Sequence, residues 1–535
     1  MPEAADVVLR SLLERNAAAE PDRRLVSFED GTTWTNAEAL AEAYAAGNAL
    51  RALGVNRGDA VAVFLPNGPD FLRVWWGACA IGAVVVPVNL AFRGPMLEHL
   101  LRTAGVVAVV VDSERAGRLD ELGSSTGVDE LGPSTHAVRR IDPASITASR
   151  DADPPKLDAP IEPWDLHLLV MTSGTTGPSK VSRTTYWHVC LGEEYLGGSG
   201  FGADDVFLVD LPLFHAGGLY SVMVSLAAGA SFVVRSAPAL ASYWETAREL
   251  GVTTAVLVSS MITYLVAQPP RASDTDHRLH RILSIPMPHD AASFMQRFGV
   301  RRMVTGYGST EVPAAVWTFY DAARPDRPIV AGSCGRLRDG FEVRLVDAHD
   351  IEVPDGSVGE AMVRTALPWM MSQGYENNDE ATVAAWRNGW FHTGDLLRRD
   401  GDGNYFFVDR ASDSLRRRGE NISTFEVEAQ VAAFPGVADV ACVAARCGEH
   451  IDDEVKVWVV PSPGAVLDPA ELLRFCADRM PHFMVPRYIE LIDALPKTPS
   501  AKVRKFLLRE RGNCAATWDR EEHGLRMTRD GLVER

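Results

Sequence analysis

Apolar runs in the first part of the chain have the length and composition of buried strands. The clearest occupy residues 60–66, 106–112, 206–212 and 253–259. Continuous runs of this length, rich in β-branched residues, are typical of parallel strands that are covered on both faces. Segments with a helix-like pattern, such as residues 238–251, lie between them. The alternation of strands with helices predicts layers of α/β structure.

A different pattern follows further along the chain. The segments 341–350, 359–364 and 403–410 are short, bounded by turns and partly alternating between apolar and polar positions. Such segments are typical of antiparallel strands. They predict a small antiparallel β unit at the end of the large α/β body.

A second domain is predicted after Asp409. The pattern starts again there with a charged turn, and helices are expected from about Thr424 and from Asp468. About 100 residues with helices and strands of their own are enough for a small α+β domain. The expected units are a large N-terminal domain over 1–409, a smaller C-terminal domain over 413–512, and a polar tail without a clear pattern over 513–535.

Composition excludes some classes of partner and site. The chain has 535 residues, of which 46% are hydrophobic and 23% are charged, as expected for a folded protein with more than one domain. The formal net charge of −18 argues against nucleic acid, because phosphate-backbone binding depends on clusters of Lys and Arg. The seven cysteines form no Cys-x-x-Cys pair, which predicts neither a zinc site nor a disulfide framework and favours a reducing, cytoplasmic setting.

No secretory signal and no membrane span are expected. The N-terminal residues lack a basic start followed by an apolar run, and residues 7–13 fit an amphipathic helix. The longest nearly uncharged stretch, residues 79–92, is too short to span a bilayer and is interrupted by Pro87. We interpret it as the end of a helix that leads into a buried strand.

The segment Met-Thr-Ser-Gly-Thr-Thr-Gly-Pro-Ser-Lys at 171–180 has the composition of an anion-binding loop. Its glycines let the backbone bend close to an anion, while N–H groups, hydroxyls and the Lys180 ammonium offer donors. The spacing is not that of a Walker A loop. A surface turn is the alternative interpretation of the same residues.

The segment Gly-Tyr-Gly-Ser-Thr-Glu at 306–311 follows a strand-like run. Its glycines permit close approach of the backbone, Thr310 offers a hydroxyl, and Glu311 offers the hard oxygen that Mg²⁺ prefers beside substrate phosphates. The alternative is a strand-to-loop turn in which Glu311 is merely solvated.

Two further segments carry candidate chemistry. Asp395 ends Gly-Trp-Phe-His-Thr-Gly-Asp, and a carboxylate on a tight turn can accept hydrogen bonds from both hydroxyls of a ribose. Lys497 and Lys502 lie in the proline-containing loop 496–502. A loop lysine is usually solvated, so a catalytic role for either depends on the other motifs.

In this order and at these separations, the motifs resemble those of the adenylate-forming superfamily of acyl-CoA synthetases, peptide-synthetase adenylation domains and luciferases. The resemblance extends from near Phe28 to near Lys505. It implies an α/β fold whose small domain is mobile and rotates about a hinge at 410–412, so that one active site performs two reactions.

The resemblance also implies a role for each motif in binding ATP and Mg²⁺. Residues Thr172 to Lys180 correspond to the loop that covers the β- and γ-phosphates. Tyr307 to Glu311 correspond to the contact with adenine and the α-phosphate, with Thr310 on the phosphate and Glu311 on Mg²⁺. Ser284 to Pro288 occupy the place of the wall against adenine.

Four residues complete the implied site. Asp395 and Arg410 match the pair that binds ribose. Lys502 matches the lysine that bridges the carboxylate and the α-phosphate, where an ammonium offsets the repulsion of two anions. His215 matches a catalytic position at the acyl pocket and thiol tunnel, although a satisfied buried histidine is an equally good interpretation. The residues assigned to the nucleotide are Thr172, Ser173, Gly174, Thr175, Thr176, Gly177, Lys180, Ser284, Ile285, Pro286, Gly306, Tyr307, Gly308, Ser309, Thr310, Asp395, Arg410 and Lys502.

The chain departs from the superfamily pattern at the hinge and at the implied CoA tunnel. Ser412 stands where Asp or Lys is common, and Arg418 stands where a glycine often lines the tunnel, next to Gly419 and Glu420. Residues 416–428, with 268–283 and 212–220, look like the branch that includes carnitine and crotonobetaine CoA ligases.

The resemblance implies a ligase that uses ATP and Mg²⁺ to activate a carboxylic acid as acyl-AMP, releases pyrophosphate, and then transfers the acyl group to coenzyme A. An amine, a carrier protein or an oxyacid other than a carboxylate is the alternative, and a non-catalytic nucleotide-binding regulator is a third. The acid itself is not determined, although Trp187, Phe214, Met261 and Tyr307 are candidates for its pocket. Homodimers are common among relatives, so the resemblance allows one.

Overall fold

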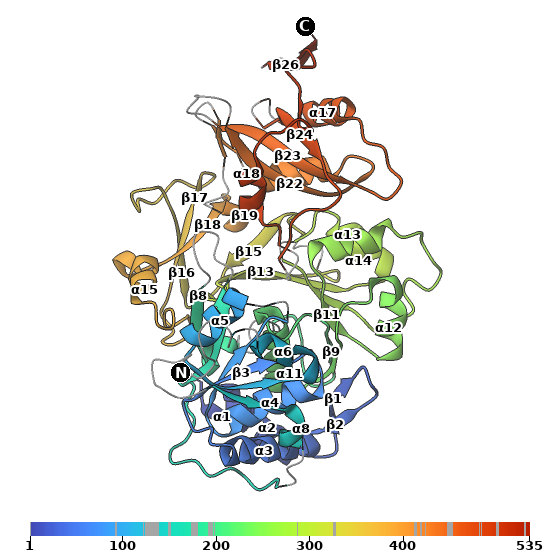
Figure 1. The fold of residues 1–535 in the computed structure, drawn as a ribbon. Helices are drawn as coiled ribbons and strands as arrows, with labels where there is room; N and C mark the ends of the chain where they lie inside the picture. The colour runs from blue at the N-terminus through green and yellow to red at the C-terminus, as the bar shows by residue number, and fades with distance from the viewer. Residues whose placement is uncertain are drawn as a thin grey trace.

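The chain forms a large domain with a small domain at one end. The computed structural model describes residues 2–90, 92, 94–120, 122, 138–147, 151–172, 180–190, 196, 198–285, 287–324, 328–410, 415–417, 420–422, 424–446, 453–480, 482, 484–498, 502–528 and 531–534. Figure 1 shows the small domain, in orange and red, above the large one. None of the helices described is long and apolar enough to span a bilayer.

One layer of the large domain is a sheet of six described strands. Five of them are parallel, and only the edge strand β8 runs antiparallel to its neighbour β7. The run at 60–66 forms β3, which is buried along its whole length, so the prediction of a covered parallel strand is confirmed. In spatial order the strands are β6 (Arg139–Ile141), β5 (Val106–Val111), β3 (Ala60–Phe64), β4 (Val84–Pro87), β7 (Leu166–Thr172) and β8 (Lys180–Thr185).

A second sheet of thirteen described strands has a mainly parallel half and an antiparallel half. The runs at 206–212 and 253–259 form β9 and β11 in the parallel half, as predicted. The parallel half and its edge contain β13 (Arg302–Tyr307), β12 (Arg281–Leu283), β11 (Thr254–Val256), β9 (Val206–Val209), β10 (Ser231–Val234), β1 (Arg24–Phe28) and β2 (Thr33–Thr35).

The antiparallel half confirms the small β unit predicted at the end of the large domain. Its strand β18 was not expected, because the motif that contains Asp395 was interpreted as a turn only. The strands are β14 (Val316–Asp321), β15 (Ser333–Leu337), β16 (Phe341–Val346), β17 (Val358–Thr365), β18 (Phe391–Arg399) and β19 (Asn404–Arg410).

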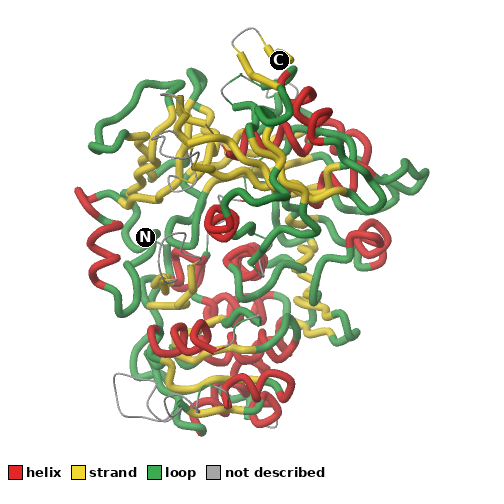
Figure 2. Tube along the Cα trace, turned by 45° about the horizontal axis from the view of Figure 1, so that its top comes forward, coloured by secondary structure: helices red, strands yellow, loops and turns green. Residues whose placement is uncertain are grey.

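Helices lie on both sides of the strands in the lower part of the molecule (Figure 2). The helix expected over 238–251 is shorter, since a 3₁₀ turn, η2 (Leu240–Ser242), precedes it. The helices are α1 (Ala4–Val7), α2 (Leu9–Ala19), α3 (Asn36–Ala52), α4 (Pro69–Ala80), α5 (Gly94–Thr103), α6 (Ser113–Asp120), α8 (Pro143–Thr147), α9 (Tyr186–Val189), α11 (Ala216–Ala228), α12 (Tyr243–Glu249), α13 (Ser259–Ala267), α14 (Ala291–Phe298), α15 (Asp379–Ala385) and the 3₁₀ turn η3 (Arg387–Gly389).

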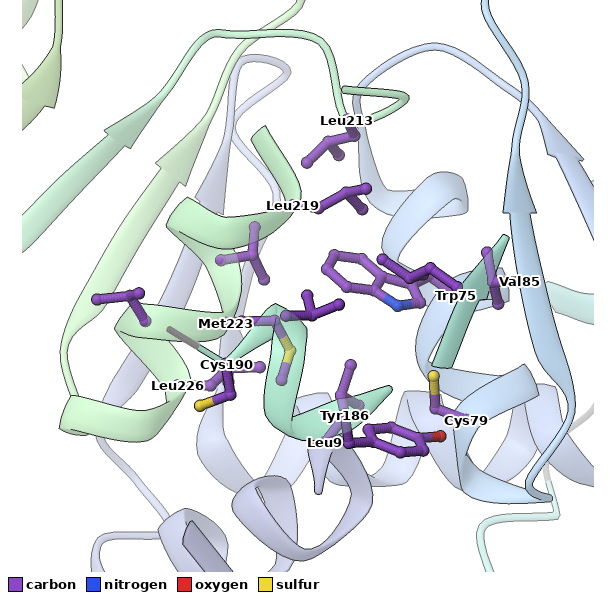
Figure 3. Packing of buried hydrophobic residues seen from close by; sticks show 14 of the residues in the cluster. Leu9, Trp75, Cys79, Val85, Tyr186, Cys190, Leu213, Leu219, Met223 and Leu226 are labelled. Carbon is purple, nitrogen blue, oxygen red and sulfur yellow. The ribbon is translucent and has the colours of Figure 1, made fainter. Parts of the chain in front are cut away.

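The main core joins these helices. Helices α3 and α4 approach so closely that a Cβ atom at Gly77 would lie 2.5 Å from the Cβ atom of Ala46, which only glycine avoids. Figure 3 shows Trp75 of α4 in the same cluster as Leu219 and Met223 of α11. Because α11 starts directly after His215, this packing fixes the position of that histidine.

The small domain has the helices and strands expected of it. Its helix from Asp468 begins as predicted, since the Asp468 side chain accepts a hydrogen bond from the N–H of Ala470 and Pro469 takes the first helical position. Its elements are β20 (Leu415–Arg417), β21 (Glu420–Ile422), α16 (Thr424–Ala432), β22 (Val437–Arg446), β23 (Asp453–Pro461), α17 (Pro469–Ala477), β24 (Tyr488–Leu491) and α18 (Lys505–Arg511).

The tail after Gly512, which shows no clear pattern in the sequence, contains short strands. The tail adds strand β25 (Trp518–Asp519) to β24, and the hairpin β26 (Leu525–Thr528) and β27 (Gly531–Glu534) follows. Arg520 is buried and donates to the carbonyl of Val485. Strands of two to four residues are too short to show a period in the sequence.

Candidate active site

Most of the predicted residues lie at the carboxyl ends of parallel strands, which is where open α/β sheets bind their ligands. His215 lies beyond the end of β9, Ser284 directly follows β12, and Tyr307 is the last residue of β13. Strands β12 and β13 are direct neighbours, with Leu283 opposite Val304. The sheet therefore gathers at one edge three segments that are far apart in the sequence.

The segment 306–311 ends strand β13 at Tyr307 and then forms a tight loop from Gly308. A Cβ atom at Gly308 would lie 2.7 Å from the carbonyl oxygen of Val312, so the loop requires glycine there. The N–H of Ser309 donates to the same oxygen at 2.8 Å, and the N–H of Ala315 donates to the Tyr307 carbonyl at 3.1 Å. These bonds close the loop, which carries Glu311 at its tip.

The Glu311 carboxylate is held through both of its oxygens. The hydroxyl of Ser309 donates to Oε2 at 2.9 Å, and the hydroxyl of Tyr375 donates to Oε1 at 3.0 Å. The Lys180 ammonium lies 4.8 Å from the centre of the Tyr375 ring. Burial, together with the negative charge of Glu311, raises the pKa of Tyr375, so its hydroxyl stays protonated and continues to donate.

This set of donors fits Mg²⁺ bound mainly by a substrate. No group of three or more His, Cys, Asp or Glu among the described residues could hold a metal by itself. Glu311 offers one hard carboxylate next to the Lys180 ammonium, and Mg²⁺ sites commonly combine one or two carboxylates with the phosphates of a nucleotide.

Asp395 is joined directly to the 306–311 loop. The hydroxyl of Tyr307 donates to Asp395 Oδ2 at 2.8 Å, and both residues are buried. The backbone of β18 just before Asp395 is fixed because the N–H of Gly394, whose φ is +68°, donates to the Glu360 carboxylate at 3.1 Å. Strand pairing places Asp395 opposite Arg410, and only the backbone of Arg410 is described.

His215 occupies the N-cap position of α11, and its Nε2 has no hydrogen-bond partner among the described residues. The interpretation of a histidine satisfied by the protein therefore does not fit this atom. Burial and, as the smaller cause, the positive charge of Lys502 together lower the pKa of His215 to about 4. The imidazole is neutral at pH 7.

The charge of Lys502 reaches His215 from the other domain. Lys502 closes a small loop in which the N–H of Thr498 donates to the Lys502 carbonyl at 2.7 Å. The Lys502 side chain is exposed, as expected for a loop lysine. Its charge nevertheless acts on His215 of the large domain.

The predicted wall against adenine begins with a buried residue. Ser284 is fully buried, and its hydroxyl has no hydrogen-bond partner in the described structure. Ile285, the next residue, is 48% exposed although it is apolar. The N–H of Met287 donates to the Ser333 carbonyl at 3.1 Å, which ties the far end of the segment to β15. A buried hydroxyl beside an exposed apolar side chain is suited to a flat heterocycle.

Some predicted residues lie outside the described parts of the chain. Thr172 and Lys180 are described and face each other at the end of the β7–β8 hairpin, where the Thr172 hydroxyl donates to the Lys180 carbonyl at 3.3 Å. For Glu420 only the backbone is described. The predicted residues outside the description are Ser173, Gly174, Thr175, Thr176, Gly177, Pro286, Ser412, Arg418 and Gly419.

The candidates for the acyl pocket have different surroundings. Phe214 lies against His215, with 5.1 Å between the ring centres. Trp187 belongs to the hydrophobic core of the large domain. The hydroxyl of the candidate Tyr307 donates a hydrogen bond to Asp395.

Three residues near Glu311 were not predicted. Tyr375 contacts Glu311 directly, and burial together with the negative charge of Glu311 raises the pKa of a second tyrosine, Tyr220. The His188 ring lies 6.5 Å from the Tyr220 ring, and burial lowers the pKa of His188 to about 4. Each of these side chains resembles an ordinary packing residue in the sequence, so no local pattern could have identified it.

Comparison with known proteins identifies the class of proteins that the chain resembles. The family model of AMP-binding enzymes matches residues 13–376, and the model of their C-terminal domain matches residues 426–502. The crotonobetaine/carnitine–CoA ligase of Escherichia coli is 29% identical over 472 residues, which cover 85% of this chain and 89% of that ligase.

Solved structures show the same fold. ATP-bound MatB from Rhodopseudomonas palustris has a TM-score of 0.81 at 23% identity and covers 95% of this chain and 99% of its own. The anthranilate CoA ligase AuaEII, in complex with anthranoyl-AMP, has a TM-score of 0.83 at 22% identity, with 96% and 99% covered.

The chain therefore belongs to the family of AMP-binding enzymes. The predicted membership of the adenylate-forming superfamily is confirmed, as is the likeness to its branch of crotonobetaine/carnitine–CoA ligases. At the level of this family, the prediction of an AMP-forming acid–thiol ligase is confirmed. The two-domain α/β fold is confirmed as well.

Proposed function

We propose that the protein activates a carboxylic acid with ATP as an acyl-adenylate, releases pyrophosphate, and then transfers the acyl group to coenzyme A with release of AMP. The observation that carries this proposal is the convergence of four distant segments: three are linked through the side chains of Tyr375 and Tyr307, and the fourth acts on His215 through its charge. They contribute Lys180, Tyr307 with Glu311, Asp395, and, from the small domain, Lys502.

Each of these residues has a task in forming the adenylate. The Asp395 carboxylate, oriented by Tyr307, is suited to accept hydrogen bonds from the ribose hydroxyls. The Lys180 ammonium, at the end of the β7–β8 hairpin, is suited to hold the leaving pyrophosphate. Glu311 would hold Mg²⁺, which when bound neutralises charge on the phosphates.

Lys502 and His215 act where the acid meets the α-phosphate. Two anions approach each other there, and a positioned ammonium offsets the charge that develops. The neutral imidazole of His215, whose Nε2 has no hydrogen-bond partner among the described residues, can accept a hydrogen bond there and, because it stays uncharged, does not repel Lys502. The interaction with Lys502 corresponds to the adenylation arrangement of the two domains.

Transfer to coenzyme A requires the lysine to leave. We propose that the small domain rotates about residues 410–412, so that a thiol can reach the acyl-adenylate. Strand β19 of the large domain ends at Arg410, and the next described residues, from Leu415, form the β20–β21 hairpin. The connection between the domains is therefore short, as a hinge should be.

The experiment is direct detection of products. The purified protein is incubated with ATP, MgCl₂, coenzyme A and each member of a panel of aliphatic, aromatic and zwitterionic acids, and acyl-CoA, AMP and pyrophosphate are measured by mass spectrometry. We expect stoichiometric acyl-CoA, AMP and pyrophosphate with at least one acid. Failure to consume ATP with any acid would contradict the proposal and favour a nucleotide-binding regulator.

Parallel reactions test the acceptor. Amines and a phosphopantetheinylated carrier protein replace coenzyme A under the same conditions. Acyl-adenylate that is transferred to one of them, and not to coenzyme A, would keep the adenylation step and replace the second step. Arg418 and Ser412, which depart from the superfamily pattern, are the sequence features that motivate this comparison.

A further inference from the structure

Tyr375 contacts two charged residues that the proposed function needs, and it does so with two different parts of its side chain. Its hydroxyl donates to Glu311 Oε1 at 3.0 Å, and the face of its ring lies 4.8 Å from the Lys180 ammonium. Tyr375 itself is 7% exposed. It therefore stands between the carboxylate assigned to Mg²⁺ and the ammonium assigned to pyrophosphate.

The backbone around Tyr375 is fixed by the large domain alone. Tyr375 pairs with Ser182 of β8 in an antiparallel bridge, and its N–H donates to the hydroxyl of Thr382 at 2.9 Å. On either side, the N–H of Arg183 donates to the Gly374 carbonyl and the N–H of Glu376 donates to the Val181 carbonyl. The ring is thus placed without help from a nucleotide or from the small domain.

An aromatic ring in this place keeps two opposite charges available. The Glu311 carboxylate and the Lys180 ammonium both contact Tyr375, and no ion pair joins the two among the described residues. The ring face attracts the ammonium, while the hydroxyl binds the carboxylate. Without the ring, the flexible lysine could reach the carboxylate, and a direct ion pair would compete with both Mg²⁺ and pyrophosphate.

We infer that Tyr375 is a positioning residue that holds Glu311 and Lys180 apart, so that the metal and the phosphates of ATP each find a charged partner. The inference rests on the proposed function. It assigns the hydroxyl to the metal side of the site and the ring to the phosphate side.

Two substitutions separate these assignments. Tyr375→Phe keeps the ring and removes the hydroxyl, whereas Tyr375→Leu removes both. Tyr44→Phe is the matched control, because Tyr44 is a buried tyrosine whose hydroxyl also donates to a carboxylate, that of Glu14, at 2.6 Å between α2 and α3. Thermal unfolding of the full chain shows whether each variant is folded.

The measurement is calorimetric titration of the full chain with ATP, with and without MgCl₂, in the absence of any acid. For Tyr375→Phe we expect ATP affinity without Mg²⁺ to be unchanged and the gain on adding Mg²⁺ to fall by about tenfold, the usual range for a lost hydrogen bond to a charged group. For Tyr375→Leu we expect affinity to fall under both conditions. For Tyr44→Phe we expect no change under either condition.

Two results would overturn the inference. One is a Mg²⁺ effect in Tyr375→Phe equal to that of the wild type and of Tyr44→Phe. The other is an equal loss in Tyr375→Phe with and without Mg²⁺, which would make the hydroxyl part of the phosphate site. Neither result depends on turnover, so a wild type that binds ATP but activates no acid would contradict the proposed function alone.

Discussion

Two parts of the candidate site differ in how they are held. The cluster of Glu311, Ser309, Tyr375 and Lys180 belongs to one domain, and hydrogen bonds within that domain hold the carboxylate from both sides. The interaction of Lys502 with His215 crosses between domains and depends on how they are placed. Under the proposed function, the residues assigned to the nucleotide are positioned by the large domain itself, whereas the lysine assigned to the reaction is supplied by the small domain.

The largest effect on activity is expected from removing the ammonium of Lys502, which the small domain contributes. Lys502→Ala should lower the rate of acyl-adenylate formation by about 10²–10³-fold, as expected for the loss of a charge that stabilises the transition state. Transfer of a supplied acyl-adenylate to coenzyme A should be largely retained. Single-turnover kinetics of each half-reaction measure the two effects separately.

Lys497→Ala is the matched control for this substitution. Lys497 lies in the same loop but forms an ion pair with Asp439 on the surface of the small domain, and such pairs contribute little. We expect near-normal adenylation. Equal losses in the two variants would show that the loop is needed but not the particular ammonium of Lys502.

The second prediction weakens the small domain alone. Lys456 and Glu490 form a buried ion pair at 2.8 Å, and Lys456 also donates to the Gly512 carbonyl at 2.6 Å, which fastens the tail. Lys456→Met leaves Glu490 without this partner and should lower the free energy of unfolding of the small domain by about 3 kcal/mol. Differential scanning calorimetry measures the change.

The same variant, Lys456→Met, tests whether ATP binding depends on the large domain alone. ATP affinity of Lys456→Met, measured below the unfolding temperature, should equal that of the wild type. A large loss of ATP affinity would show that the nucleotide site is not built by the large domain alone.

The third prediction concerns the hydrogen bond between Tyr307 and Asp395, which both belong to the large domain. Tyr307→Phe keeps the ring but removes the hydrogen bond to Asp395, and we expect the KM for ATP to rise by about tenfold. The kcat should change little, because ribose binding is the same in the ground state and the transition state. An unchanged KM, as in the control Tyr44→Phe, would argue against Asp395 as the ribose ligand.

The smallest expected effect is a rise in the pKa of His215 when the charge of Lys502 is removed. Burial and the Lys502 charge lower the pKa of His215 to about 4 from an ordinary value of 6.5, whereas burial is the main cause of the similar value of His188. Lys502→Ala should therefore raise the pKa of His215 and leave that of His188 unchanged. NMR titration of the histidines measures both pKa values, and equal shifts of the two would contradict an electrostatic interaction between Lys502 and His215 across the domains.

The sign of the associated pH dependence follows. Because the pKa of His215 is lower in the folded protein, the unfolded chain binds the proton more readily between about pH 6.5 and pH 4. Its contribution to stability is complete above this window and is lost as the pH falls through it. The loss should be smaller in Lys502→Ala, since the pKa of the folded state is then closer to its ordinary value.

Long apolar runs in the sequence predicted strands correctly, and short local motifs predicted candidate site residues. The run at 60–66 forms the fully buried strand β3, because a continuous apolar run has few other stable arrangements. Strand β25 was missed because two residues show no period. The tail therefore shows no clear pattern in the sequence, although its strand β25 pairs with β24 and extends the sheet of the small domain.

The candidate site was predicted more through resemblance than through pattern. Nothing local indicates that Tyr307 reaches Asp395, which lies 88 positions later in the chain. The motif roles implied that the two residues are near each other, and the fold brings them into contact. Tyr375 lies in none of these motifs, and its partners are Glu311, in the loop after β13, and Lys180, the first residue of β8, so only the three-dimensional structure reveals its position.

The most direct test of the account is exchange of labelled pyrophosphate into ATP in the absence of coenzyme A, with each acid of the panel. This exchange isolates the first reaction and needs both the nucleotide site of the large domain and Lys502 of the small domain. The account predicts acid-dependent exchange in the wild type and in Lys497→Ala, and its loss in Lys502→Ala. Absence of exchange in the wild type with every acid, or equal exchange in Lys502→Ala, would contradict it.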